Sequence, residues 1–172
     1  MPKGSRCLWG AALAAATLAA LVSIAADRAG AAAPVGAPRF QTSDRCMPCH
    51  NNLSTRGGED ISIGLAWRPT MMANAARDPY WQASVRRESM EHPAAQEGIE
   101  DECSICHMPM ARYEAAGAGQ KGTVFAHLGF VPGNPQDELA GDGVSCALCH
   151  QVSREKLGTR ETFVGRFILG GP

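Results

Sequence analysis

The stretch DECSICHMPMARYE, residues 101–114, places two cysteines and a histidine within five positions. Cys103, Cys106 and His107 form a C-x-x-C-H unit, and two methionines follow around a proline. Side chains three and four positions apart lie on one face of a helical turn, so these three groups can meet a single ligand. The fold therefore depends on what such a unit binds.

The same unit occurs twice more along the chain. RCMPCHNN holds the first unit and SCALCHQV holds the third, with the residues Cys46, Cys49, His50, Cys146, Cys149 and His150. Only one cysteine, Cys7, lies outside the three units. Every cysteine after the N-terminal segment therefore belongs to a pair that is followed at once by histidine.

Three chemistries use such pairs. Two thiols at this spacing can add to the two vinyl groups of one haem, and the adjacent histidine can then bind its iron. A zinc site takes four nitrogen or sulfur ligands, so two pairs would combine and the third would have no partner. Structural disulfides would not require a histidine after each pair. The sequence predicts three covalent c-type haems, with zinc as the alternative.

Residues 1–33 have the pattern of a secretory signal peptide. Lys3 and Arg6 precede an apolar run over residues 8–26, and small residues offer cleavage sites near 31–33. We expect cleavage there, with Cys7 removed as well, and export to the bacterial periplasm. An extracellular location is the alternative for the exported protein, and a retained segment would instead give a membrane-associated protein. Residues 34–172 then form one triheme cytochrome c domain. We expect either that this sequence is truncated at its C-terminus or that the protein is a three-haem variant.

The composition leaves the interior short of large side chains. The chain has 172 residues, with 19 Gly and 11 Pro but only 6% aromatics. We therefore expect porphyrin to fill much of the interior. With 16 basic and 17 acidic residues there is no basic surface for nucleic acid. Candidate partners for haem propionates are Arg68, Arg77, Arg86, Arg87 and Arg112.

Helical signals outnumber strand signals. Asp78 is a natural N-cap and Pro79 a natural first residue, which predicts a helix over 79–91 with Trp81, Val85 and Ser89 or Glu88 on one face and His92 at its end. A shorter helix is expected over 69–76, and the one strand over 123–131. Residues 34–43 and 115–122 should be loops. The expected fold is mainly α with long irregular loops, compact and packed around covalent haems.

Three irons have six axial positions. His50, His107 and His150 fill three as proximal ligands, which leaves only His92 and His127 among the histidines. These two are candidate distal ligands, and at least one iron needs methionine, another group or an open position. Met108 and Met110 stand too close behind His107 to reach the far side of its haem. We expect them to pack in the core.

Three stretches resemble the multihaem cytochrome c superfamily. They are WRPTMMANAARDPYWQASVRRES, EDECSICHMPMARYE and DGVSCALCHQV, and the resemblance covers about residues 41–166. It is strongest in pattern to the tetrahaem cytochromes that accept electrons from hydroxylamine oxidation and to related exported multihaem proteins. Members of this superfamily often carry a Trp-x-x-Ser-x-His motif whose histidine is a distal iron ligand. Here Met72 stands in that place, which implies one His/Met haem with Met71 as the fallback ligand. A fourth C-x-x-C-H unit of that tetrahaem family is absent from this sequence.

Two functions are compatible with these residues. The first is an electron carrier that passes electrons between redox partner proteins through three haems and has no substrate of its own. The alternative is a multihaem oxidoreductase that acts on a small nitrogen or sulfur oxyanion at an open iron, with Arg112 and Tyr113 near the second haem. The chain is short for such an enzyme, and no C-x-x-C-K variant occurs. We therefore expect the carrier.

Overall fold

Helices and turns dominate the part of the chain that the computed structural model describes, residues 38–170. The α-helices are α2 (Met47–His50), α3 (Ile63–Trp67), α4 (Pro79–Glu91), α5 (Gln96–His107), α6 (Pro109–Gly117), α7 (Pro135–Gly141), α8 (Cys146–Gln151) and α9 (Arg160–Phe163). The 3-10 helices are η1 (Ser43–Arg45), η2 (Pro93–Ala95) and η3 (Phe125–His127). Extended pairing within residues 38–170 is limited to two isolated bridges, Ser54 with Asp60 and Val152 with Leu169. The expected mainly α fold with irregular loops is confirmed.

The N-terminal predictions cannot be compared with this structure. The expected signal peptide, residues 1–33, lies outside the described residues, as does the start of the loop expected over 34–43. Residues 38–42 are irregular up to the start of η1. Within residues 38–170, no helix is both long enough and apolar enough to span a bilayer.

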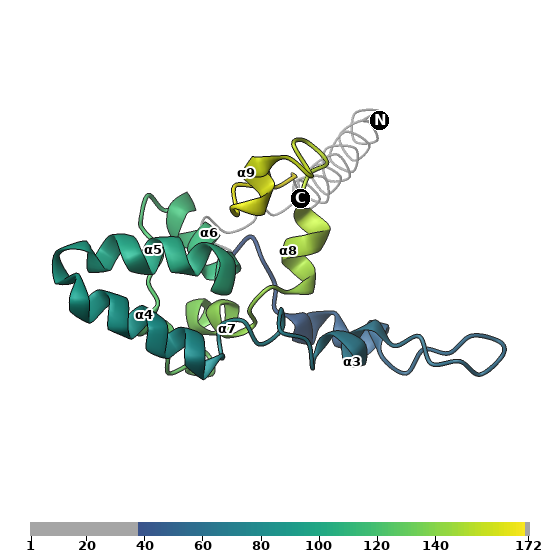
Figure 1. The fold of residues 1–172 in the computed structure, drawn as a ribbon. Helices are drawn as coiled ribbons and strands as arrows, with labels where there is room; N and C mark the ends of the chain where they lie inside the picture. Colours follow the sequence, from purple (N-terminus) through teal and green to yellow (C-terminus); the bar gives the residue numbers. More distant parts are fainter. Residues whose placement is uncertain (1–37, 171–172) are drawn as a thin grey trace, which may run out of the picture. The chain divides into compact units, whose positions relative to one another are not determined.

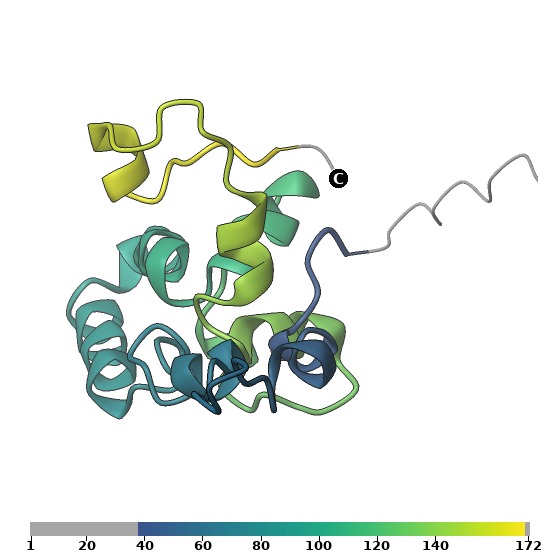
Figure 2. The ribbon, with the colours of Figure 1, turned by 90° about the vertical axis from the view of Figure 1, so that its right-hand side faces the viewer.

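The helices α4 and α5 lie side by side, and η2 joins them (Figure 1). Helix α6 contacts both α5 and α7, and Figure 2 shows α8 leading away from this group toward the segment that carries α9. The core between these helices contains Trp81 and Val85 from α4 together with Met110 and Leu139. The second C-x-x-C-H unit is thus carried by the best-packed helix pair.

Helix α4 has the bounds that its end signals predict. Asp78 accepts a hydrogen bond from the backbone N–H of Tyr80 at 2.9 Å, which satisfies one of the free donors of the first turn. Trp81, Val85 and Ser89 are buried, as expected from their spacing. His92 follows the last helical residue with a non-helical backbone, so its side chain is exposed instead of ending the buried face.

Residues 69–76 form a series of turns, so the helix predicted there is wrong. Side chains and distant backbone groups take the carbonyls that a helix would use. Asn74 donates to the carbonyls of Arg68 and Thr70, and Val144 N–H donates to the Met72 carbonyl at 3.0 Å. Such side-chain bonds compete with helical ones. The turns bury Ala73 and Ala76 but leave Met72 half exposed.

The strand predicted over 123–131 is also wrong, because this stretch forms η3 and turns. The carboxylate of Glu100 on α5 accepts hydrogen bonds from Val124 N–H at 2.8 Å and Phe125 N–H at 3.1 Å. These bonds satisfy backbone donors that would otherwise need a neighbouring strand. Val124 is fully buried at this point, so the apolar pattern reflects a core contact and not a sheet.

Two smaller expectations concern the residues after the second unit. Met108 and Met110 are fully buried in the core, which confirms that they pack there. The loop expected over 115–122 begins later than predicted, since α6 continues to Gly117. Gly119 then turns the chain with a φ of 72°, a conformation that favours glycine.

The cap of α4 gives a direct test of this fold. Replacing Asp78 with Ala removes the acceptor for Tyr80 N–H and should lower the free energy of unfolding by about 1 kcal/mol. The matched control, Asp78→Asn, keeps a good N-cap and should stay close to the natural protein. Urea unfolding followed by far-ultraviolet circular dichroism measures both. Equal stability of Asp78→Ala and the natural protein would show that the cap does not hold this helix.

Candidate haem-binding units

Each C-x-x-C-H unit lies on a helical turn. Cys46 directly precedes α2, which ends at His50, and the His50 N–H donates to the Cys46 carbonyl at 3.1 Å. The second unit forms the last turn of α5, and the third begins α8. Pro48 fits inside the first unit because a helix does not use the N–H groups of its first turn. The sequence expectation of one helical turn per unit is confirmed.

All six cysteines of these units are free thiols. Burial, followed by the nearby Cys146 thiol, raises the pKa of Cys46. Burial likewise raises the pKa of Cys103 and of Cys149. Catalytic thiols of disulfide oxidoreductases have lowered pKa values instead. The direction of the pKa shift at Cys46, Cys103 and Cys149 is opposite to that pattern.

His107 is held on two sides. Its Nδ1 lies 2.8 Å from the Ala75 carbonyl oxygen, and its ring stacks on Trp81 with centroids 4.2 Å apart and planes 5° from parallel. A carbonyl can only accept, so Nδ1 is the donor in this contact, and in the neutral imidazole the lone pair is then on Nε2. Metal-binding histidines are typically fixed in this way, through the ring nitrogen that does not bind the metal. The sequence had given Trp81 only a packing role and had offered no signal for Ala75.

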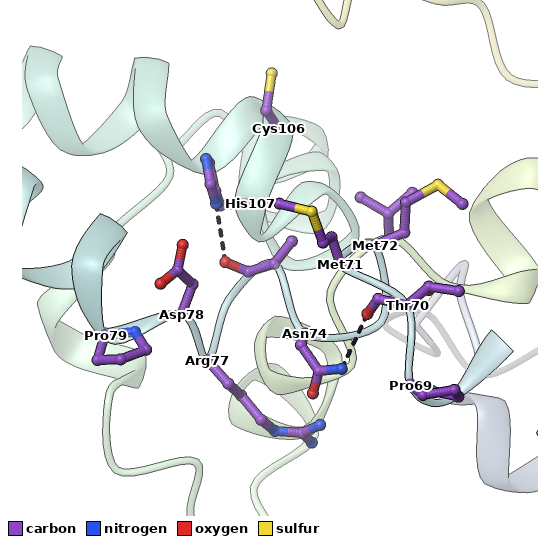
Figure 3. Close-up of a pocket in the computed structure, with 12 residues that line it drawn as sticks. Pro69, Thr70, Met71, Met72, Asn74, Arg77, Asp78, Pro79, Cys106 and His107 are labelled. Atoms are coloured by element: carbon purple, nitrogen blue, oxygen red, sulfur yellow. Dashed lines mark hydrogen bonds between the residues drawn. The ribbon is translucent and has the colours of Figure 1, made fainter.

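A cavity of about 650 Å³ adjoins the second unit. Cys106 and His107 form part of its lining, and Met71 and Met72 stand across it on the turn segment (Figure 3). In Figure 3 the Met71 thioether is directed toward His107, whereas that of Met72 points to the other side. The exposed fractions are 87% for Met71 and 52% for Met72. Both candidate methionines therefore lie beside the second unit.

The first and third units meet at a second cavity, of about 270 Å³. Cys46 and His50 of the first unit line it together with Cys146 and His150 of the third unit, and Ile63 is also part of the lining. We call this the shared cavity. Two units that are far apart in the sequence thus become neighbours, which no motif in either unit had indicated.

The two remaining histidines lie apart from these cavities. His127 Nδ1 is 2.7 Å from Asp137 Oδ1, and its Nε2 is 3.2 Å from Thr123 Oγ1. His92 is exposed at the end of α4. Neither is among the residues that line the cavity at the second unit or the shared cavity. Their role as distal ligands stays a prediction.

The arginines expected near propionates have different surroundings. Arg112 pairs with Asp101 at 3.1 Å, and Arg68 lies 3.7 Å from Asp44. Arg87 pairs with Glu91 at 2.9 Å within α4, and Arg86 lies over the ring of Phe125. Arg77 is the member of this group that lines the cavity at the second unit. It is therefore the best placed to meet a propionate there.

These residues fit a covalently attached haem. Two thiols and an imidazole share each helical turn, and at the second unit His107, whose Nδ1 contacts the Ala75 carbonyl, lies beside a largely apolar cavity. Haem brings four nitrogen ligands of its own, so the protein supplies only axial ligands. Across residues 38–170, no three side chains of the His, Cys, Asp and Glu types converge as a protein-only metal site requires.

Comparison of the chain with models of known protein families, with curated proteins and with solved structures found no match.

Stacking of Trp81 on His107 makes a measurable prediction. Trp81 is 8% exposed, so Trp81→Ala should lower the free energy of unfolding by about 3–5 kcal/mol through lost burial and the cavity that remains. Trp81→Phe keeps an aromatic ring against His107 and should recover part of this loss. Tyr80→Ala is the control, because Tyr80 is 81% exposed. Similar urea midpoints for Trp81→Ala and Tyr80→Ala would contradict the packing described here.

Proposed function

We propose that the protein is an exported c-type cytochrome that carries electrons between redox partner proteins through three covalent haems. One observation carries the proposal: each unit presents two free thiols and a histidine on a single helical turn. Covalent haem is the ligand that uses all three donors of every unit. The resemblance of the sequence to multihaem cytochromes supports the same function.

The chain's own part in attachment is addition chemistry. The two cysteines of each unit would hold one haem through thioether bonds, each made by addition of S–H across a vinyl C=C, so that a C–S bond would form and the proton would go to the neighbouring vinyl carbon. No oxidant or reductant is consumed in this step. When bound, each haem supplies an iron that takes up and releases one electron.

The chain also determines how the irons are held. His50, His107 and His150 would be the proximal ligands, and the Ala75 carbonyl keeps His107 in the tautomer that binds through Nε2. His92, His127 and Met72 are the proposed distal ligands, with Met71 as the fallback. The position of both methionines beside the second unit favours a His/Met haem at that unit.

A relay requires that the haems lie close together. The shared cavity supports this for the first and third units, because both present cysteine and histidine side chains to it. Electron tunnelling falls steeply with distance, so neighbouring attachment points favour rapid transfer between these two haems. A relay depends on closely spaced haems, so the neighbouring first and third units favour a carrier over an oxidoreductase acting on an oxyanion.

The haem count tests the proposal directly. Intact-mass measurement of the purified protein should show three haem additions, and Cys103→Ala combined with Cys106→Ala should remove one of them. Met110→Leu is the control at a nearby buried position and should keep all three. A natural protein that carries zinc, or fewer than three haems, would overturn the assignment.

A redox titration tests the proposed methionine ligand. Methionine raises the reduction potential of a haem relative to a second histidine, so Met72→His should lower the highest of the three potentials and leave the others nearly unchanged. Met71→His is the matched comparison. If that variant alone lowers the potential, Met71 is the ligand. Three low potentials in the natural protein would rule out both methionines, and binding of CO to the natural protein would indicate an open iron and favour the oxidoreductase.

A further inference from the structure

A buried hydrogen-bonded pair connects the chain just before the first unit to the chain just before the third. Asp142 Oδ2 accepts from the Ser43 N–H at 2.8 Å, and Asp142 Oδ1 accepts from the Ser43 hydroxyl at 2.7 Å. Ser43 is fully buried, and Asp142 is 5% exposed. The two residues are 99 positions apart in the sequence. We call this contact the Ser43–Asp142 pair.

Each member of the pair is joined to its unit by a short, well-ordered connection. Ser43 begins η1, and its carbonyl accepts from the N–H of Cys46 at 2.8 Å. Asp142 directly follows α7 as its C-cap, four residues before Cys146. Two residues lie between Ser43 and Cys46, and three lie between Asp142 and Cys146. Movement at the pair would therefore be passed on to both units.

The segment before the third unit is also fixed on its other side. Gly143 has a φ of 65°, and a Cβ atom there would lie 2.7 Å from the Met72 carbonyl oxygen. Val144 donates its N–H to that same oxygen at 3.0 Å, and its own carbonyl accepts from Trp67 Nε1 at 3.1 Å. These contacts hold the segment against residues 67–73. The Ser43–Asp142 pair then sets where the first unit lies relative to it.

We propose that Ser43 and Asp142 are positioning residues that set the spacing of the first and third haems, and with it the coupling between them. This inference rests on the proposed function. Neither residue lines the shared cavity, so both would act through the units that they position. Two hydrogen bonds to one carboxylate fix direction and register, which an apolar contact of the same size would leave free to slide. A loosened pair should leave both haems attached but change their mutual geometry.

Circular dichroism in the Soret region measures this geometry on the haem-loaded protein. Two haems held close together give a paired positive and negative signal, whose size depends on their separation and angle. Cys146→Ala with Cys149→Ala removes the third haem and should abolish the signal, which assigns it to this pair of haems. Intact mass gives the haem count of each variant, so that loss of a haem is not mistaken for loss of coupling.

Three variants separate the hydrogen bonds from the charge. Asp142→Ala removes both acceptors, and most of the paired signal should disappear while three haems remain. Asp142→Asn can still accept from the Ser43 N–H and can donate to its hydroxyl, so the signal should survive without the charge. Asp101→Ala is the matched control, because Asp101 also accepts from one backbone N–H and one side chain but stands beside the second unit. It should leave the signal unchanged.

The outcomes distinguish this inference from the proposed function. Fewer than three haems in the natural protein would refute the proposed function itself. Three haems without a paired signal, or an undiminished signal in Asp142→Ala, would overturn the positioning role. Equal losses in Asp142→Asn and Asp142→Ala would also overturn it, because the charge and not the hydrogen bonds would then matter. If Asp142→Ala loses a haem, Ser43→Ala decides: a reduced signal with three haems supports the role, and an unchanged one refutes it.

Discussion

The geometry of a single helical turn is the constraint on which this protein depends. Because side chains three and four positions apart share one face, the turn brings two thiols and an imidazole together without any help from distant residues. Three such turns then have to be placed relative to one another, and the rest of the fold places them. The α4–α5 hairpin carries the second unit, while buried polar contacts bring the first and third units together.

Local signals in the sequence predicted the local structure well. Asp78, Pro79 and Pro93 mark the ends of α4, and the helical turns of the C-x-x-C-H units follow from their spacing. The predictions that were wrong concern segments whose backbone groups form hydrogen bonds with residues far away in the sequence. The carbonyl of Met72 is used by Val144, and the N–H of Val124 by Glu100, so neither segment forms the regular element that its own residues favour. Such contacts cannot be predicted from a short stretch of sequence.

In the candidate site, too, the local features could be predicted from the sequence and the long-range contacts could not. The cysteines and histidines of the three candidate haem-binding units could be named from the motif, and the burial of Met108 and Met110 could be predicted from their position. The supporting groups could not, because a backbone carbonyl at Ala75 and a carboxylate 99 residues from its serine have no distinguishing pattern. The distal iron ligands are still more difficult to predict from the sequence. They depend on which side chains surround a bound haem, and His92 and His127 lie away from both cavities at the units.

The central claim is that three haems, and no zinc, are bound by the three units. Elemental analysis of the purified protein, combined with its pyridine haemochrome spectrum, tests this most directly. We predict three irons per chain, no zinc, and the haemochrome spectrum of haem whose two vinyl groups have both become thioethers. Zinc in place of iron, or a spectrum of haem with intact vinyl groups, would contradict the account.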